Sequence, residues 1–438
     1  MNEGAFQDSL EYAKELDRQD PLSAYRDRFH LPKHKNGQPL IYFCGNSLGL
    51  QPKQTAKFIQ EELEDWASLG VEGHFTSRRP WFSYHELFTQ SAARIVGTQP
   101  GEVVMMNSLT VNLHLMLVSF YRPTAARHKI LMEAQPFPSD LYAAQSHLQN
   151  HGYDPKEGLL FLQPRTGETV VRTEDIESLL ASRGQEIALF LLGGVNYYTG
   201  QAFQMDRLTK SAQAQGCVVG YDLAHAAGNL PMRLHDWNVD FAVWCTYKYL
   251  NAGPGGVGGC FVHERHGRNS ASGAPGARSS ASGQNTALPR LAGWWGNDPS
   301  TRFSIPETFS PQPGAAGWQL SNAPILPLAA LKASLDIFDE VGMKALRTKS
   351  ILLTNFLEFL LRKDSSRPYA ILTPSSSEER GCQLSIRIKG NAKSVQLALR
   401  QKGVAADYRA PDVFRVAPVP LYNTFEEVWQ FVRILNEI

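Results

Sequence analysis

An aspartate and a lysine stand at the ends of two successive apolar runs. Asp222 closes the run 217–222, and Lys248 follows the run 241–245. Such runs are typical of buried strands, and the carboxyl ends of parallel strands meet at one edge of a sheet. A lysine amine near a fixed carboxylate is what pyridoxal phosphate requires. The amine forms a Schiff base with the cofactor, and the carboxylate keeps the pyridine nitrogen protonated.

Each of these residues also has a plain structural interpretation. Lys248 can be a solvated loop lysine, and Asp222 can cap a helix that begins within LAHAAG. His225 would lie on the same side of that first helical turn. There it could reach a cofactor or substrate, or be an ordinary core histidine. The cofactor interpretation is favoured because other segments supply the rest of a pocket.

Two upstream segments have the character of cofactor subsites. Leu109 and Thr110 follow the strand-like run VVMM and open an apolar helix. Free N–H groups at such a helix start favour a phosphate, although ordinary capping by threonine is the alternative. The second segment is the motif FPSD, which comprises Phe137, Pro138, Ser139 and Asp140. Phe137 could stack on a pyridine ring, whereas Ser139 and Asp140 could equally cap the next helix.

The order of apolar runs predicts an α/β fold. Strand-like runs occur at residues 129–133, 187–192, 217–222, 241–245 and 258–263. They alternate with helical stretches and are apolar almost throughout, which favours a mainly parallel sheet buried on both faces.

The chain is expected to divide into a large and a small domain. We expect an N-terminal segment over 1–75 that packs with the small domain, a large domain over 76–323, and an α+β small domain over 324–438. The small domain begins with expected helices over 326–341 and 343–361, and a later helix is expected near 392–401. Residues 264–289 are rich in Ser, Gly and Ala, which predicts a flexible surface insertion.

Composition narrows the class of partner. The formal net charge is +1, so no basic surface for nucleic acid is indicated and a small-molecule substrate is favoured. No run approaches the roughly 20 apolar residues of a membrane span. The five cysteines lack metal-site spacing and are interpreted as reduced thiols, and the polar N-terminus has no signal peptide. We therefore expect a cytoplasmic protein without a metal site.

A glycine pattern near the lysine matches a dinucleotide-binding motif. Gly253, Gly255 and Gly258 fit GxGxxG, the dinucleotide fingerprint. That motif requires a helix after it and an acidic residue about 20 positions on. Here a strand-like run follows instead. A glycine-rich turn that lets the backbone approach a ligand is the favoured interpretation over an NAD site.

Ten motifs over residues 42–423 resemble, in order, those of the kynureninase family. They are YFCGNSLGLQP, RRPW, LTVNLHL, FPSD, YTGQ, DLAHAAGN, YKYLNAG, GWWG, STRF and RVAPVPLYN. The resemblance implies the fold of type I pyridoxal-phosphate enzymes. It also implies a hydrolase acting on carbon–carbon bonds in ketonic substrates. The expected reaction converts L-kynurenine or 3-hydroxy-L-kynurenine to anthranilate or 3-hydroxyanthranilate plus L-alanine, in tryptophan breakdown or NAD synthesis.

The same resemblance implies a role for each matching cofactor residue. Lys248 would hold the cofactor, Asp222 would pair with the pyridine nitrogen, and His225 would contact the cofactor. Phe137 would be the stacking ring within FPSD. Phosphate contacts would come from Leu109, Thr110 and Tyr247. Tyr247 is also the expected proton donor near the reacting carbon.

Substrate and partner contacts are implied in the same way. Trp294 and Asn322 match positions that reach the cofactor across a dimer interface, so a homodimer with shared active sites is expected. His74 and Asn322 would contact the aromatic ring of the substrate, which favours the 3-hydroxy form. Arg415 would bind the α-carboxylate. One departure concerns Gly193, where the family commonly has a serine.

Two other functions remain open from the sequence. A cysteine desulfurase or selenocysteine lyase of the same fold would need a nucleophilic cysteine, and Cys382 is the candidate. Its place just before a strand-like run favours a buried structural thiol. A non-catalytic pyridoxal-phosphate regulatory protein would carry a further DNA-binding or partner segment, and the sequence suggests none.

Overall fold

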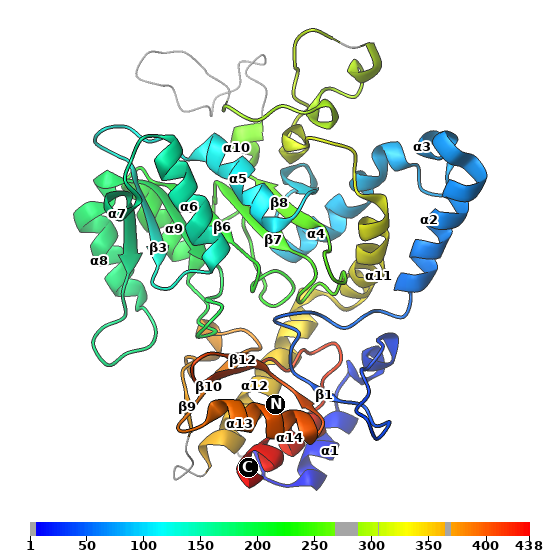
Figure 1. Ribbon diagram of the computed structural model, residues 1–438, viewed down its shortest axis with the longest axis vertical. Coiled ribbons are helices and arrows are strands. Elements are labelled where there is room, and N and C mark those ends of the chain that lie inside the picture. The colour runs from blue at the N-terminus through cyan, green and yellow to red at the C-terminus, as the bar shows by residue number, and fades with distance from the viewer. Residues whose placement is uncertain (1–5, 268–287, 305, 364–368) are drawn as a thin grey trace.

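A seven-stranded sheet forms the centre of the computed structural model, which describes residues 6–267, 288–304, 306–363 and 369–438 (Figure 1). The strand order is β2-β8-β7-β6-β5-β3-β4. The strands are β2 Val103–Met105, β3 Lys129–Glu133, β4 Leu159–Leu162, β5 Ile187–Gly193, β6 Val218–Asp222, β7 Phe241–Cys245 and β8 Gly258–Val262. Strands β4, β3, β5, β6 and β7 pair in parallel, while β8 runs antiparallel to both of its neighbours, β7 and β2. The predicted mainly parallel sheet is confirmed.

Helices cover both faces of this sheet because successive strand residues point to opposite sides. On β5, Leu189 and Leu191 join the core cluster of α5 and α6, whereas Phe190 and Leu192 join the cluster of α8 and α9. The bounds of these helices are α5 Leu109–Phe120, α6 Pro138–Asn150, α8 Thr173–Arg183 and α9 Met205–Ala214. Burial on both faces explains why the strand runs are apolar without alternation.

A second, smaller sheet lies in the C-terminal part of the chain (Figure 1). It is antiparallel with the order β12-β13-β10-β9. Its strands are β9 Tyr369–Ile371, β10 Leu384–Ile388, β12 Asp407–Arg409 and β13 Val413–Val416. The accompanying helices are α11 Ile325–Val341, α12 Met343–Arg362, α13 Ala392–Gln401 and α14 Phe425–Glu437. The three helices expected in this region are therefore confirmed, to within one residue at each bound.

The N-terminal segment reaches both parts of the molecule. Strand β1, Ile41–Tyr42, pairs in parallel with β11, Val404–Ala405. Further on, the Gly49 N–H donates to the Tyr247 carbonyl at 2.8 Å. A Cβ on Gly49 would lie 2.3 Å from the carbonyl oxygen of Lys248, so only glycine allows this approach. The division of the chain at 75 and 323 stays a prediction.

The remaining helices are α1 Leu10–Arg18, α2 Thr55–Leu69, α3 Gly73–Thr76, α4 Thr89–Val96, α7 Pro155–Gly158 and α10 Glu264–Gly267. Helix α10 corrects the expectation that the flexible insertion begins at 264, because the Glu264 N–H donates to buried Glu102 at 2.7 Å. Most of the predicted insertion, 268–287, lies outside the described residues. Among the described residues, no helix is long and apolar enough to cross a membrane.

Candidate active site

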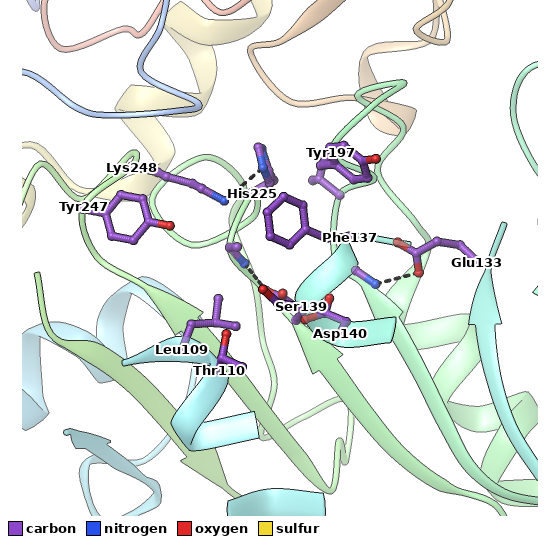
Figure 2. A pocket seen from close by; sticks show the side chains of 14 residues that line it. Leu109, Thr110, Glu133, Phe137, Ser139, Asp140, Tyr197, His225, Tyr247 and Lys248 are labelled. Carbon is purple, nitrogen blue, oxygen red and sulfur yellow. Dashed lines mark hydrogen bonds between the residues drawn. The ribbon is translucent and has the colours of Figure 1, made fainter. Parts of the chain in front are cut away.

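A pocket opens at the carboxyl ends of the parallel strands, where the sequence predicted a ligand (Figure 2). Nine of its lining residues are predicted cofactor contacts: Leu109, Thr110, Phe137, Ser139, Asp140, Asp222, His225, Tyr247 and Lys248. The other five are Glu133, Gly193, Val195, Tyr197 and Ala224. The structure thus brings together residues from six separate segments of the chain.

Lys248 enters the pocket from the loop after β7. Its Nζ lies 3.1 Å from His225 Nε2 and 5.8 Å from the centre of the Phe137 ring. Burial, and then the charge of Lys248, hold the pKa of His225 well below its usual value. The imidazole is therefore neutral, and a neutral Nε2 accepts a hydrogen bond from the amine. His225 Nδ1 is buried and finds no hydrogen-bond partner among the described residues, as expected of a group that faces a ligand.

The segment after Asp222 is a series of turns, which corrects the expected helix. An oxygen of Asp222 accepts the Ala224 N–H at 2.7 Å. An aspartate caps the first amides of a helix in the same way, but here the chain continues in turns. His225 reaches the pocket through the turn rather than through a helical face.

Two buried carboxyl groups meet beneath the pocket. Burial raises the pKa of Asp222, while the charge of Lys248 and a hydrogen bond from Asp140 act in the opposite direction. Burial, and then the charge of Asp222, raise the pKa of Asp140 well above its usual value. Asp140 is thus the member of the pair that is protonated more readily. This arrangement keeps one negative charge available for a protonated pyridine nitrogen.

The first residues of α5 and α6 show that neither Thr110 nor Ser139 and Asp140 are helix caps. The N-cap of α5 is Ser108, which makes no side-chain hydrogen bond to the helix, so capping by Thr110 is wrong. Phe137 precedes α6, with Pro138 as its first residue, so Ser139 and Asp140 lie inside the first turn. The uncapped N–H groups of α5 remain free for an anion.

The glycines after Lys248 allow a turn and a close contact between two backbone segments. Gly253 and Gly255 have φ of +85° and +69°, which favours glycine. A Cβ on Gly258 would lie 2.9 Å from the backbone of Ser108. Strand β8, not a helix, follows, so the NAD interpretation is wrong. Gly258 instead lets β8 pack directly beneath the start of α5.

Arg415 lies behind the pocket wall and is nearly completely buried, at 1% exposure. Its Nη1 donates to the Tyr197 carbonyl at 2.8 Å, and its Nη2 donates to Asp407. Within the part of the chain that the structure describes, the Nε has no hydrogen-bond partner. The Tyr197 ring lines the pocket and packs edge-on against Phe137 at 5.4 Å between ring centres. Arg415 therefore does not line the pocket itself but holds Tyr197, which does.

Besides Pro138 and Arg415, three other predicted contacts do not line this pocket. Trp294 is 49% exposed, and Asn322 is also exposed. His74 packs edge-on against Trp81 at 5.5 Å, with its Nδ1 buried and without a partner. None of the three lines the pocket of its own chain.

The sequence could have indicated one of the pocket residues that we missed. Glu133 closes the strand-like run 129–133, at the same sheet edge as Asp222. Tyr197 and Val195 follow β5 in a loop, and Ala224 follows β6, so no local pattern distinguishes them. Together, the lysine, the ionised Asp222, the orphaned His225 nitrogen and the free start of α5 fit pyridoxal phosphate.

Comparisons with known proteins agree with this fit. An aminotransferase class-V family model matches residues 41–287, and a kynureninase C-terminal domain model matches 346–435. A cysteine desulfurase of Escherichia coli shares the fold, with a TM-score of 0.73, 16% identity, and coverage of 95% of this chain and 98% of that one. The protein is thus a pyridoxal-phosphate enzyme of fold type I.

Sequence relatives narrow the class. The kynureninase of Myxococcus xanthus is 55% identical, covering 98% of this chain and 97% of that one. The kynureninase of Koribacter versatilis is 53% identical, covering 99% and 98%. The chain belongs to the kynureninase family, hydrolases that act on carbon–carbon bonds. Cys382 is 1% exposed, and burial raises the pKa of its thiol to about 12. A thiol held neutral in this way is a poor nucleophile, which disfavours the desulfurase alternative.

Proposed function

We propose that this pocket hydrolyses L-kynurenine, 3-hydroxy-L-kynurenine or both, giving anthranilate or 3-hydroxyanthranilate plus L-alanine. The carrying observation is the position of Lys248 Nζ, 3.1 Å from neutral His225, above the pair formed by Asp222 and Asp140. Bound pyridoxal phosphate supplies an electron sink that makes the bond next to the aryl ketone cleavable. Membership of the kynureninase family supports this substrate and a place in tryptophan breakdown or NAD synthesis.

The chain divides the cofactor contacts among four places: the loop after β7, the end of β6, the residue before α6 and the start of α5. Lys248 holds the cofactor covalently and moves the substrate α-proton as a base and acid. Asp222 pairs with the pyridine nitrogen, and Phe137 stacks on the ring. The start of α5, at Leu109 and Thr110, binds the phosphate.

Other side chains act on the substrate. Arg415 binds the α-carboxylate through its fork of N–H groups, which suits a planar carboxylate. Burial raises the pKa of Tyr247, so its phenol remains protonated and serves as the proton donor near the reacting carbon. His74 and Asn322 contact the aromatic ring and favour the 3-hydroxy substrate.

We infer that the active site is completed by a second copy of the chain. Trp294 lies in an exposed aromatic cluster with Phe303 and Phe75, which are 60% and 56% exposed. Ring centres are 5.5 Å apart for Trp294 and Phe303, and 6.4 Å apart for Phe75 and Phe303. Large aromatic rings exposed together are typical of protein interfaces. A homodimer would cover this cluster and bring Trp294 and Asn322 to the partner's pocket.

Reduction with borohydride tests the central assignment. The purified protein, loaded with pyridoxal phosphate and reduced, should yield a peptide modified at Lys248. Modification at another lysine would refute the assignment. Loaded protein given kynurenine or 3-hydroxykynurenine should produce anthranilate fluorescence, whereas sulfide release from cysteine would support a desulfurase instead.

The free state of all five cysteines supports a cytoplasmic location for this reaction.

A further inference from the structure

A third buried carboxyl group lines the pocket, and none of the proposed steps uses it. Glu133 ends β3 and is 6% exposed. One oxygen accepts the Gly193 N–H at 3.0 Å. In Figure 2, Glu133 lies on the far side of Phe137 from Lys248. Burial of an acidic side chain carries a desolvation cost, which hydrogen bonds, charge partners or protonation must offset.

The sheet order fixes which side of the cofactor Glu133 faces. Along the carboxyl edge, Lys248 follows β7, Asp222 ends β6, Gly193 ends β5 and Glu133 ends β3. Gly193 is the register partner of Asp222. The phosphate subsite, beside β8, lies at the opposite end of this row. Glu133 and the start of α5 are thus on opposite sides of Asp222.

The substituent pattern of pyridoxal phosphate completes the placement. The pyridine nitrogen and the carbon bonded to the lysine lie opposite one another on the ring. One ring edge between them carries the phosphate arm, and the other carries the methyl group and the phenolic oxygen. Because Asp222 and α5 define the nitrogen and the phosphate arm, the remaining edge points toward Gly193 and Glu133.

Gly193 provides the space that this arrangement requires. A Cβ at this position would lie 3.0 Å from an oxygen of Glu133 and 3.2 Å from the Val195 carbonyl. A side chain at 193 would therefore displace the Glu133 carboxyl by a few tenths of an ångström. Glycine leaves the carboxyl against the pocket, with its backbone N–H as the bond donor.

We propose that Glu133 is a further cofactor-contacting residue, which faces the ring edge carrying the methyl group and the phenolic oxygen and adjusts the charge of the linkage to Lys248. This inference rests on the proposed placement of the cofactor on Lys248 and Asp222. A neutral Glu133 donates a hydrogen bond toward the phenolic oxygen. An ionised Glu133 stabilises the protonated nitrogen of the lysine linkage.

Both charge states of Glu133 are accessible near neutral pH. Burial raises its pKa to about 7, the Gly193 N–H lowers it, and the charge of Asp222 raises it. The titratable groups facing it within the pocket are Asp222, Asp140 and Tyr197. A second cavity on its other side is lined by amide and charged groups that include Gln135, Gln163, Glu168, Asn196, Gln201 and Arg387. This polar cavity gives the carboxyl a route for proton exchange.

The test compares Glu133→Gln with the unmodified protein, each loaded with pyridoxal phosphate and free of substrate. Visible absorbance is recorded across pH, because it reports the proton on the lysine linkage. We expect the deprotonation midpoint of Glu133→Gln to fall by on the order of one pH unit, since a nearby anion is lost. The matched control is Glu168→Gln, which lines the second cavity but not the pocket, and its midpoint should equal that of the unmodified protein.

Coinciding midpoints in Glu133→Gln and the unmodified protein would overturn the inference. If circular dichroism shows that Glu133→Gln is unfolded, Gly193→Ala replaces it. Its deprotonation midpoint should fall in the same direction by a smaller amount, and an unchanged midpoint would count against the role of Glu133. Failure of the two proposals remains distinguishable. A loaded, unmodified protein that borohydride does not modify at Lys248 refutes the cofactor placement, whereas modification there without a shift refutes only the role of Glu133.

Discussion

Glu62 organises the segment that carries His74, and its replacement by glutamine is expected to destabilise the fold. The carboxylate is 1% exposed on α2. It accepts hydrogen bonds from Arg79 Nε at 2.7 Å, Trp81 Nε1 at 2.8 Å and the Tyr84 hydroxyl at 2.9 Å. Arg79 and Trp81 belong to the RRPW motif, and the Trp81 ring packs against His74. The motif is thus explained by one buried acceptor.

The size of the effect follows from these three bonds. Arg79 and Tyr84 share one oxygen of Glu62, and Trp81 uses the other. A glutamine that keeps its carbonyl at the first oxygen retains two bonds, but loses the charge assistance to Arg79, worth about 1 kcal/mol. Its amide then faces the Trp81 N–H, which leaves two buried donors opposed at a cost of about 1–3 kcal/mol. We expect the free energy of unfolding to fall by about 3 kcal/mol.

Urea unfolding of the unmodified protein, Glu62→Gln and Tyr84→Phe measures this loss. Tyr84→Phe removes one neutral bond and should cost about 1 kcal/mol. Displacement of His74 should also raise the KM for 3-hydroxykynurenine more than that for kynurenine. If Glu62→Gln is no less stable than Tyr84→Phe, the carboxylate does not organise this segment and the reasoning is refuted.

Three further outcomes are expected. Arg415→Lys should lower kcat/KM by roughly 100-fold, mainly through KM, because lysine lacks the planar fork. Burial, and then the charge of Arg302, lower the pKa of His85 to about 4 from 6.5. As pH falls, the unfolded chain therefore takes up this proton before the folded protein does, so the free energy of unfolding should decline by about 3 kcal/mol between pH 6.5 and 4. In His85→Gln this one proton is absent, so the free energy of unfolding measured in urea should fall less steeply with pH. Trp294→Ala mixed with Lys248→Ala should regain activity if the pocket is shared between copies, whereas activity equal to the sum of the separate variants would contradict the dimer.

The nearness of Asp222 and Lys248 could be predicted because it depends on local pattern. Each follows a run of apolar residues, and β6 and β7 are indeed neighbours in the sheet. The start of α5 at Leu109 follows equally from the change from strand-like to helical periodicity. Features set by strand order and helix starts are therefore within reach of sequence reasoning.

Features that depend on distant parts of the chain were not predictable. Tyr197 is held by Arg415, far away in sequence, through its carbonyl oxygen. The turns at His225 were also not predictable, because Asp222 accepts the Ala224 N–H as a helix N-cap would, yet the chain continues in turns. Only the family resemblance indicated that Trp294 would lie outside the pocket of its own chain, because its position depends on the packing of the whole molecule.

The pairing of β1 with β11 has a consequence for synthesis. Residues 41–42 leave the ribosome early, but their partners at 404–405 are among the last to be made. At about 5–20 residues per second, the first strand waits on the order of twenty seconds to a minute before it can pair. Gly49 waits for a shorter time, because its contacts at Tyr247 and Lys248 are made just past the middle of the chain. The growing chain must therefore keep residues 41–42 unpaired until translation is nearly complete.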